Sequence, residues 1–238
     1  MSTFIGAPRL HTTRQIATDP ARRRIVRMAC SLLLDYPDER LGPELAAVRA
    51  ELDRLPTEIR TELAAFCDAA QAWGLRALQE QYVETFDQRR RCALSLTYYS
   101  HGDTRGRGQA ILAFRELMSR AGFEMTPGEF PDYLPAVLEF SALDETGTGE
   151  RLLRANREGL EVLRSALHSA DSPYRHLLDA LVLTLPMPDE HVLAAYRALV
   201  TEGPPSELVG IADSGPENIS TENVRPEDIS TENVTGRR

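Results

Sequence analysis

The residues best suited to chemistry stand in the segment YYSHGDTRGRGQ, residues 98–109. Glycine-rich backbone at the start of a helix, together with Arg105 and Arg107, could hold an anionic group such as a phosphate. The Walker pattern is absent, because no lysine follows the last glycine and no strand pattern precedes the segment. The alternative is structural and has the stronger physical support. In it, Asp103 or Thr104 caps the helix and the arginines pair with carboxylates across the core.

A second concentration of unusual residues is EFPDYLPAVLEF, residues 129–140. Pro131 prevents the preceding loop from continuing into the helix, and Asp132 stands where an N-cap belongs. Pro135 falls in the first turn, where a missing amide costs little. This pattern predicts an ordinary, well-capped helix. The functional interpretation is that Asp132 and Tyr133 project from the rigid start of the helix toward a groove.

The composition excludes several kinds of chemistry. All 27 residues counted as lysine plus arginine are arginine, so the chain has no phosphate-binding or Schiff-base lysine. The net charge of −9 argues against nucleic acid as the main partner. Three widely spaced cysteines are typical of buried free thiols in a reducing compartment. The five histidines show no zinc-site spacing, so we expect no structural metal.

The sequence pattern predicts that all the elements that position these residues are helices. Asp19 and Pro20 predict an N-cap and a first helical residue, Thr57 a further N-cap, and Gly74 a left-handed helix end. The first helix carries an apolar stripe that predicts a core-facing surface, made of Ile25, Met28, Ala29, Leu32 and Leu33. The expected helices span residues 20–34, 43–55, 57–74, 75–87, 109–122, 132–144, 150–170, 173–185 and 189–200.

The pattern therefore predicts an all-α fold, a single-domain helical bundle of roughly eight to nine helices over residues 19–203. Residues 1–18 show no periodicity and are expected to form a flexible arm. Residues 204–238 contain a polar decapeptide twice and carry seven acidic residues against three arginines, so we expect a disordered acidic tail. No apolar run is long enough to cross a bilayer, which favours a soluble, cytoplasmic protein.

Three stretches carry a resemblance to a known family. They are LLLDYPDE near the start, YVETFDQRRRCALSLTYYSHGDTRGRGQA in the middle, and EFPDYLPAVLEF shortly after it. Over about residues 25–185 the chain resembles the nitrate reductase assembly chaperones of the NarJ type, within the redox-enzyme maturation chaperones. The two central motifs are long and unusual, so the resemblance is specific, and it does not extend to the repeated tail.

The resemblance implies a non-enzymatic, all-helical cytoplasmic chaperone without a cofactor of its own. Such proteins bind the N-terminal segment of the apo catalytic subunit of respiratory nitrate reductase. They keep that subunit competent for insertion of the molybdenum cofactor and the Fe–S clusters before it docks on the membrane anchor. Proteins that deliver the molybdenum cofactor are further partners that the resemblance brings in. It implies neither nucleic-acid binding nor direct membrane insertion.

The resemblance also carries over individual residues. Position 133 can be histidine in such chaperones and is Tyr133 here, so a histidine-dependent contact is in doubt. Two alternative functions stay open. One is an enzyme or nucleotide binder that uses the loop 101–108, and the other is a generic helical peptide-binding adaptor. The expected partner-binding residues are Glu129, Asp132, Tyr133, Leu134, Glu139, His101, Asp103, Arg105 and Arg107. The expected structural residues of the motifs are Tyr82, Phe86, Asp87, Gly102, Gly108, Pro131 and Pro135.

Overall fold

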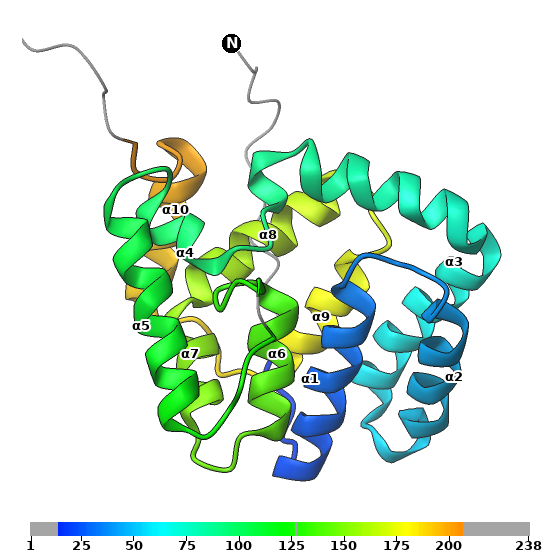
Figure 1. Cartoon of the computed structure of the whole chain (residues 1–238). Coiled ribbons are helices and arrows are strands. Elements are labelled where there is room, and N and C mark those ends of the chain that lie inside the picture. Colours follow the sequence, from blue (N-terminus) through cyan, green and yellow to red (C-terminus); the bar gives the residue numbers. More distant parts are fainter. Residues whose placement is uncertain (1–13, 127, 207–238) are drawn as a thin grey trace, which may run out of the picture. The chain divides into compact units, whose positions relative to one another are not determined.

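A computed structural model describes residues 14–126 and 128–206, and within them the fold is all-α, as predicted. Residues 1–13 and 207–238, most of the expected arm and tail, lie outside the described residues. Among the described residues there are isolated β-bridges and no named strand. The α-helices are α1 (Pro20–Leu34), α2 (Leu41–Glu51), α3 (Thr57–Tyr82), α4 (Leu96–His101), α5 (Gly106–Arg120), α6 (Leu134–Leu143), α7 (Thr148–Ala155), α8 (Arg157–Ser169), α9 (Arg175–Leu183) and α10 (Glu190–Thr201) (Figure 1).

Shorter helical segments link some of these helices. A 3₁₀-helix, η1 (Leu52–Arg54), follows α2, and a second one, η3 (Arg90–Cys92), precedes α4. Between them, η2 (Val83–Asp87) continues α3 as a π-helix. The first half of the central motif therefore lies in irregular helical backbone, the kind of backbone that is frequent at functional sites.

Several helix boundaries follow the local signals. The Asp19 carboxylate accepts a hydrogen bond from the Arg22 amide at 2.9 Å, and Pro20 is the first residue of α1, as predicted. Gly74 has φ +74°, which breaks the helical backbone within α3. The Thr57 cap is wrong, because Thr57 is already helical and Pro56 occupies the N-cap position without a side-chain hydrogen bond.

The helix expected over residues 150–170 is divided in two. Asn156 separates α7 from α8 with φ −111° and ψ +24°. Its side-chain amide donates to the Leu152 carbonyl at 2.8 Å, so the side chain satisfies a carbonyl at the end of α7. The break lies in the backbone angles of Asn156, whose own amide still donates to the Leu152 carbonyl at 3.2 Å.

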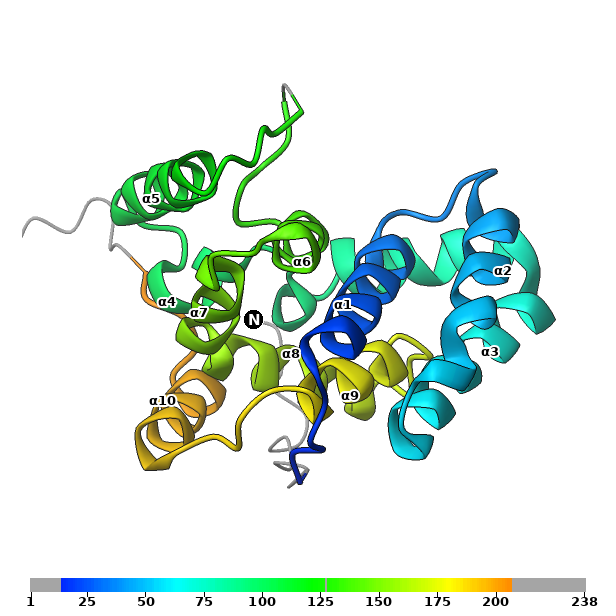
Figure 2. The ribbon, with the colours of Figure 1, turned by 90° about the horizontal axis from the view of Figure 1, so that it is seen from below.

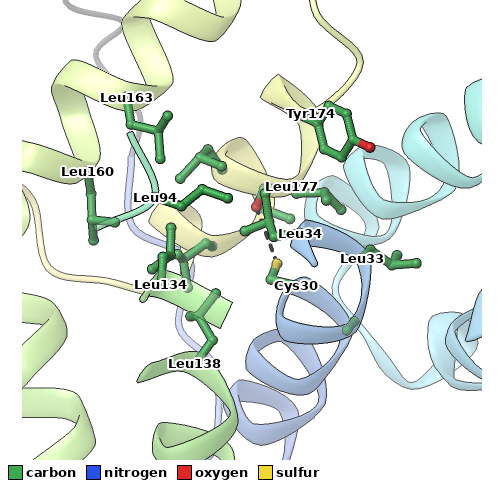
Figure 3. Close-up of a cluster of buried hydrophobic side chains, with 14 of the residues drawn as sticks. Cys30, Leu33, Leu34, Leu94, Leu134, Leu138, Leu160, Leu163, Tyr174 and Leu177 are labelled. Atoms are coloured by element: carbon green, nitrogen blue, oxygen red, sulfur yellow. Dashed lines mark hydrogen bonds between the residues drawn. The ribbon is translucent and has the colours of Figure 1, made fainter. Parts of the chain in front are cut away.

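The core is built where α1, α6, α8 and α9 meet. Figure 3 shows leucines from these helices and from the segment before α4 meeting around Cys30. The Cys30 thiol donates to the Leu177 carbonyl at 3.3 Å, and burial raises the pKa of this thiol well above its usual range. Cys30 therefore acts as a small core residue, and Cys67 and Cys92 are also free and buried.

The helices around this core place α1 between α6 and α2, as Figures 1 and 2 both show. On another side α1 packs on α9, which in turn packs against α3 and α8. Helix α8 also contacts α10 and α4, and α5 contacts α4 and, less extensively, α7. Helix α1 is therefore central to the fold, with contacts to α2, α6 and α9, whereas α5 is attached mainly through α4.

Candidate partner-binding site

The two sequence motifs are joined directly by backbone hydrogen bonds. The Leu96 amide donates to the Asp132 carbonyl at 2.9 Å, and the Leu134 amide donates to the Leu94 carbonyl at 2.7 Å. Ser95 and Tyr133 form the antiparallel bridge between these two bonds. We call this pairing the motif junction. It fixes the start of α6 against the start of α4, two helices that the sequence alone did not place together.

Asp132 is fully buried at this junction and does not cap α6. The N-cap position of α6 belongs to Tyr133 and has no side-chain hydrogen bond, so the predicted cap is wrong. The Asp132 carboxylate instead accepts a hydrogen bond from the Thr97 hydroxyl at 2.5 Å. The projection of Asp132 toward a groove is also wrong, because the motif junction turns its side chain inward. Asp132 holds α4, and any effect on a partner is indirect.

Tyr133 belongs to a chain of hydroxyl groups that begins at Asp35. Its hydroxyl donates to the Asp35 carboxylate at 3.1 Å, which leaves Tyr82 as the donor to Tyr133, at 2.9 Å. Burial is the main reason that the pKa of Tyr82 rises to about 12 and that the pKa of Tyr133 rises further. Both phenols are therefore neutral. Tyr133 is partly buried in this chain and, like Asp132, does not project freely.

An aromatic cluster surrounds the hydroxyl chain. The ring of Tyr82 lies 4.7 Å from Phe86, 5.4 Å from Tyr36 and 5.8 Å from Tyr174, measured between centroids. Phe86 and Tyr174 are 4.9 Å apart, nearly perpendicular. Such edge-to-face contacts add to the burial of apolar surface. The predicted structural role of Tyr82 and Phe86 agrees with these contacts, whereas Asp87 of the same motif is exposed.

Gly102 lies where the loop between α4 and α5 meets the segment 203–206. It has φ +54° and is buried, and a Cβ atom there would stand 1.7 Å from the Pro205 carbonyl oxygen. Asp103 then forms a parallel bridge with Ser206, beside this contact. The loop and the segment 203–206 can approach this closely only because residue 102 lacks a side chain.

The same loop offers little to a phosphate group. The amides of Arg107 and Gly108 donate to the carbonyls of Thr104 and Arg105, at 3.2 and 3.3 Å, so two amides that a cradle would use have partners. Neither Asp103 nor Thr104 caps α5, whose N-cap position has no side-chain hydrogen bond, so the predicted cap is wrong. This geometry gives the nucleotide-binding alternative no support.

Arg107 contacts α4 and the loop itself. Arg107 donates to the Thr97 hydroxyl at 3.4 Å, lies 3.7 Å from the Asp103 carboxylate and covers the ring of Tyr98. It thereby braces α4 rather than pairing across the core. Asp103 and Arg107 also line a pocket of about 350 Å³ beside η3, whereas His101 and Arg105 are absent from its lining. The structure therefore brings only part of the predicted loop set together.

Glu129 and Glu139 are the predicted acidic residues of the second motif that are only partly buried. Partial burial raises the pKa of Glu139, and the negative charge of Glu129 raises it further, which places the two carboxyl groups near each other. Leu134, Pro131 and Pro135 are buried. The second motif therefore exposes Phe130 and keeps Glu129 and Glu139 partly buried, whereas Asp132 and its other apolar residues are buried apart from Tyr133.

The clearest apolar pocket in the described residues lies elsewhere, between α1, α2 and α6. It has a volume of about 300 Å³, within the range of ligand-binding pockets. Arg24 and Glu51 are its charged residues. We call it the α1–α2–α6 pocket. Its apolar lining consists of Ile25, Met28, Ala29, Leu32, Ala47, Val48 and Ala142.

This pocket corrects the predicted core face of α1. Ile25, Met28 and Leu32 are only partly buried and face the pocket, whereas the core is formed by the neighbouring face of the helix, including Val26 and Cys30. The apolar arc of α1 is therefore wider than one core requires. The sequence contains a signal for this wider arc. Residues 26, 30 and 34 are also apolar and form a second row beside the predicted stripe.

The described residues form an all-helical protein with an open apolar pocket between α1, α2 and α6, and with a separate network of hydroxyl groups and aromatic rings at the start of α6. The chain belongs to the nitrate reductase delta subunit family, which matches residues 52–179. It is 34% identical over 164 residues to the probable nitrate reductase molybdenum cofactor assembly chaperone NarJ of Bacillus subtilis. That match covers 68% of this chain and 89% of the relative.

Two further relatives agree with this assignment. The nitrate reductase molybdenum cofactor assembly chaperone NarJ of Escherichia coli K12 is 31% identical over 155 residues, 64% of this chain and 66% of its own. The nitrate reductase-like protein NarX of Mycobacterium tuberculosis is 36% identical over 160 residues, 67% of this chain but 24% of its own, much longer, chain. Within the residues that the structure describes, no helix combines the length and the apolar character needed to cross a membrane.

Proposed function

We propose that this chain is a cytoplasmic assembly chaperone for respiratory nitrate reductase. It binds the N-terminal segment of the apo catalytic subunit and keeps that subunit competent for insertion of the molybdenum cofactor and the Fe–S clusters before membrane docking. The names of the relatives from Bacillus subtilis and Escherichia coli support the partner and the task. The role is reversible binding, with no bond made or broken.

The α1–α2–α6 pocket is the observation that carries the proposed binding mode. An amphipathic helix of the partner places its apolar side chains, spaced by three or four residues, into such a groove. Burying one or two large side chains contributes about 1.5–3 kcal/mol each, a large part of the roughly 8 kcal/mol of a micromolar complex. The net charge of −9 also attracts a basic partner segment and speeds the encounter.

The second motif connects to this pocket through α6. Glu139 precedes Ala142, a pocket residue, by three positions, so both lie on one side of the helix. The exposed Leu143 extends the apolar surface on that side. Glu129 and Glu139 accordingly stand near the pocket as acidic groups that receive basic residues of the partner, while Asp132 and Tyr133 keep α6 in place.

A peptide-binding experiment tests this function. Titration calorimetry of the full chain with a synthetic peptide of the partner's N-terminal segment should show saturable binding of one peptide per chain. Met28→Glu places a charge in the pocket and should weaken binding at least tenfold. Leu112→Glu is the matched control, because Leu112 is an exposed leucine on α5, away from the pocket. Both variants should melt close to the wild-type chain.

The possible results distinguish an error in the proposed function from an error in the proposed binding site. No saturation by the peptide, with correctly folded protein, contradicts the proposed function. If saturable binding survives in Met28→Glu, or disappears in Leu112→Glu, the proposed partner still stands. The α1–α2–α6 pocket is then not the binding site. Replacing Glu129 and Glu139 by glutamine should slow association and reduce its salt dependence, while the dissociation rate changes little.

A further inference from the structure

Two carboxyl groups and an imidazole come together where α3 packs on α9. The donor atoms of Glu62 on α3 and of His176 and Asp179 on α9 all lie within 4.8 Å of one another. His176 Nδ1 and a Glu62 carboxylate oxygen are 2.7 Å apart. His176 and Asp179 are separated by three positions, so they face α3 from one side of α9. We call these three residues the Glu62 cluster.

Asp179 is held in position by residues of α8. Arg164 Nε donates to one oxygen of the Asp179 carboxylate at 2.5 Å, and His168 Nε2 lies 2.8 Å from the other. A carboxylate that binds a metal ion is usually oriented by such outer hydrogen bonds, which also lower the cost of fixing it. The Glu62 cluster therefore has a second layer of polar contacts around one of its acidic groups.

The charges around the cluster favour an added cation. Arg157 and Arg164 both contact Glu161, at 2.6 and 3.2 Å, and Arg164 also pairs with Asp179. These four buried side chains form an alternating chain of two positive and two negative charges. Glu62 adds a further carboxylate beyond this chain, and its contact is the imidazole of His176, which carries no charge when neutral. A divalent cation between Glu62 and Asp179 would compensate the charge of the Glu62 carboxylate.

We propose that the Glu62 cluster binds a divalent first-row transition ion, with Zn²⁺ as the probe that fits best. One imidazole nitrogen and two carboxylate oxygens are a ligand set that such ions accept, and a water molecule completes four-fold coordination. Ligand atoms about 2.0–2.2 Å from zinc stand roughly 3.3 Å apart, so small side-chain rotations convert the present spacing into coordination. The side chains are 13–30% exposed, so an ion reaches them from solvent.

This site has no signature along the chain, because Glu62 and His176 are 114 residues apart. The expectation of no structural metal considered only spacing between neighbours in the sequence. The bound ion joins α3 to α9 directly and, through Asp179, to α8. Its effect is to stabilise the packing of these helices, independently of the α1–α2–α6 pocket.

Metal binding to the chelator-treated full chain tests the proposal. Equilibrium dialysis should find one Zn²⁺ per chain, and Zn²⁺ should raise the melting temperature. Glu62→Gln and His176→Gln should each weaken binding at least tenfold and abolish the rise. His191→Gln, which changes an exposed histidine on α10, should leave both unchanged. Glu62→Gln retains a hydrogen-bonding side chain, so its metal-free melting temperature should stay close to that of the wild-type chain.

Co²⁺ absorption of the wild-type chain provides a test that needs no variant. Ligation by nitrogen and oxygen gives visible bands without the near-ultraviolet charge-transfer band of a thiolate. The proposal is overturned by any of three results: no stoichiometric Zn²⁺ binding, binding unchanged in both cluster variants, or a thiolate band that assigns the ion to cysteine. In those cases Glu62 and His176 form an ordinary hydrogen bond.

Discussion

Gly102→Ala provides the sharpest test of the geometry around the central motif. Gly102 combines φ +54° with ψ −146°, a region that is essentially restricted to glycine. The added methyl group would also stand 1.7 Å from the Pro205 carbonyl oxygen, far inside van der Waals contact. Since backbone atoms oppose it, no side-chain rotation relieves the clash. The segment 203–206 must move away from the loop.

The expected cost follows from the backbone strain, because the segment 203–206 can move away from the clash. Backbone strain of this kind costs about 1–3 kcal/mol. For a domain of this size, each kcal/mol corresponds to a change of about 2–4 °C in melting temperature. We therefore expect Gly102→Ala to lower the melting temperature by about 2–12 °C. Displacement of the segment 203–206 should also increase hydrogen exchange near the end of α10, without unfolding the rest.

Gly108→Ala is the matched control from the same motif. Gly108 lies within α5, and a Cβ atom there would meet nothing within 4 Å. Replacing a helical glycine by alanine stabilises by about 0.5–1 kcal/mol. Urea denaturation followed by circular dichroism should thus show opposite shifts of the midpoint for the two variants. The reasoning is refuted if Gly102→Ala is as stable as the wild type, or if both substitutions destabilise equally.

Four further outcomes follow from the same contacts. Tyr133→Phe removes the hydrogen bond to Asp35 and leaves the buried Tyr82 hydroxyl without its acceptor, so thermal denaturation should show a loss of about 1 kcal/mol. Glu161→Gln leaves two buried arginines without their shared carboxylate and should cost about 3–5 kcal/mol in urea denaturation, and a loss below 1 kcal/mol would contradict the buried pairing. Burial raises the pKa of all three thiols, so Ellman's reagent should react slowly with the native chain and rapidly with all three cysteines in denaturant. Burial raises the pKa of Glu139, so its contribution to stability is present below the ordinary pKa and is lost as the pH rises through the folded value. Glu139→Gln should therefore gain stability relative to the wild type as the pH rises above the ordinary value of 4.5. The opposite slope would contradict the burial of this carboxyl group.

Local signals predicted the fold class and many helix boundaries. Asp19 and Pro20 act within one turn of the helix that they start, and Gly74 breaks its helix through its own φ angle. Such effects depend on neighbours in the sequence, so the sequence reveals them. The break at Asn156 is equally local, but asparagine is common within helices, and its hydrogen bond to Leu152 is one of several that it could form.

The candidate site was less predictable because its contacts are long-range. Asp132 has the sequence context of an N-cap, yet the motif junction brings Thr97 to its carboxylate from 35 positions away. The α1–α2–α6 pocket is a similar case. Periodicity shows that Met28 is on an apolar face of its helix, but it does not show which neighbouring element covers that face. The same limit applies to the Glu62 cluster, which exists only because α3 packs on α9.

The motif junction has a consequence for how the chain can vary in length. Residues 97–131 lie between the two sides of the motif junction, and its pair of backbone hydrogen bonds closes them into a loop, here called the detour. Within this detour α5 contacts α4 and, slightly, α7. The entropy of closing such a loop changes only slowly with its length. Residues added between α5 and α6 should thus leave α4 and α6 where they are, whereas removal of α5 would take the buried Phe114 and Met118 out of the core.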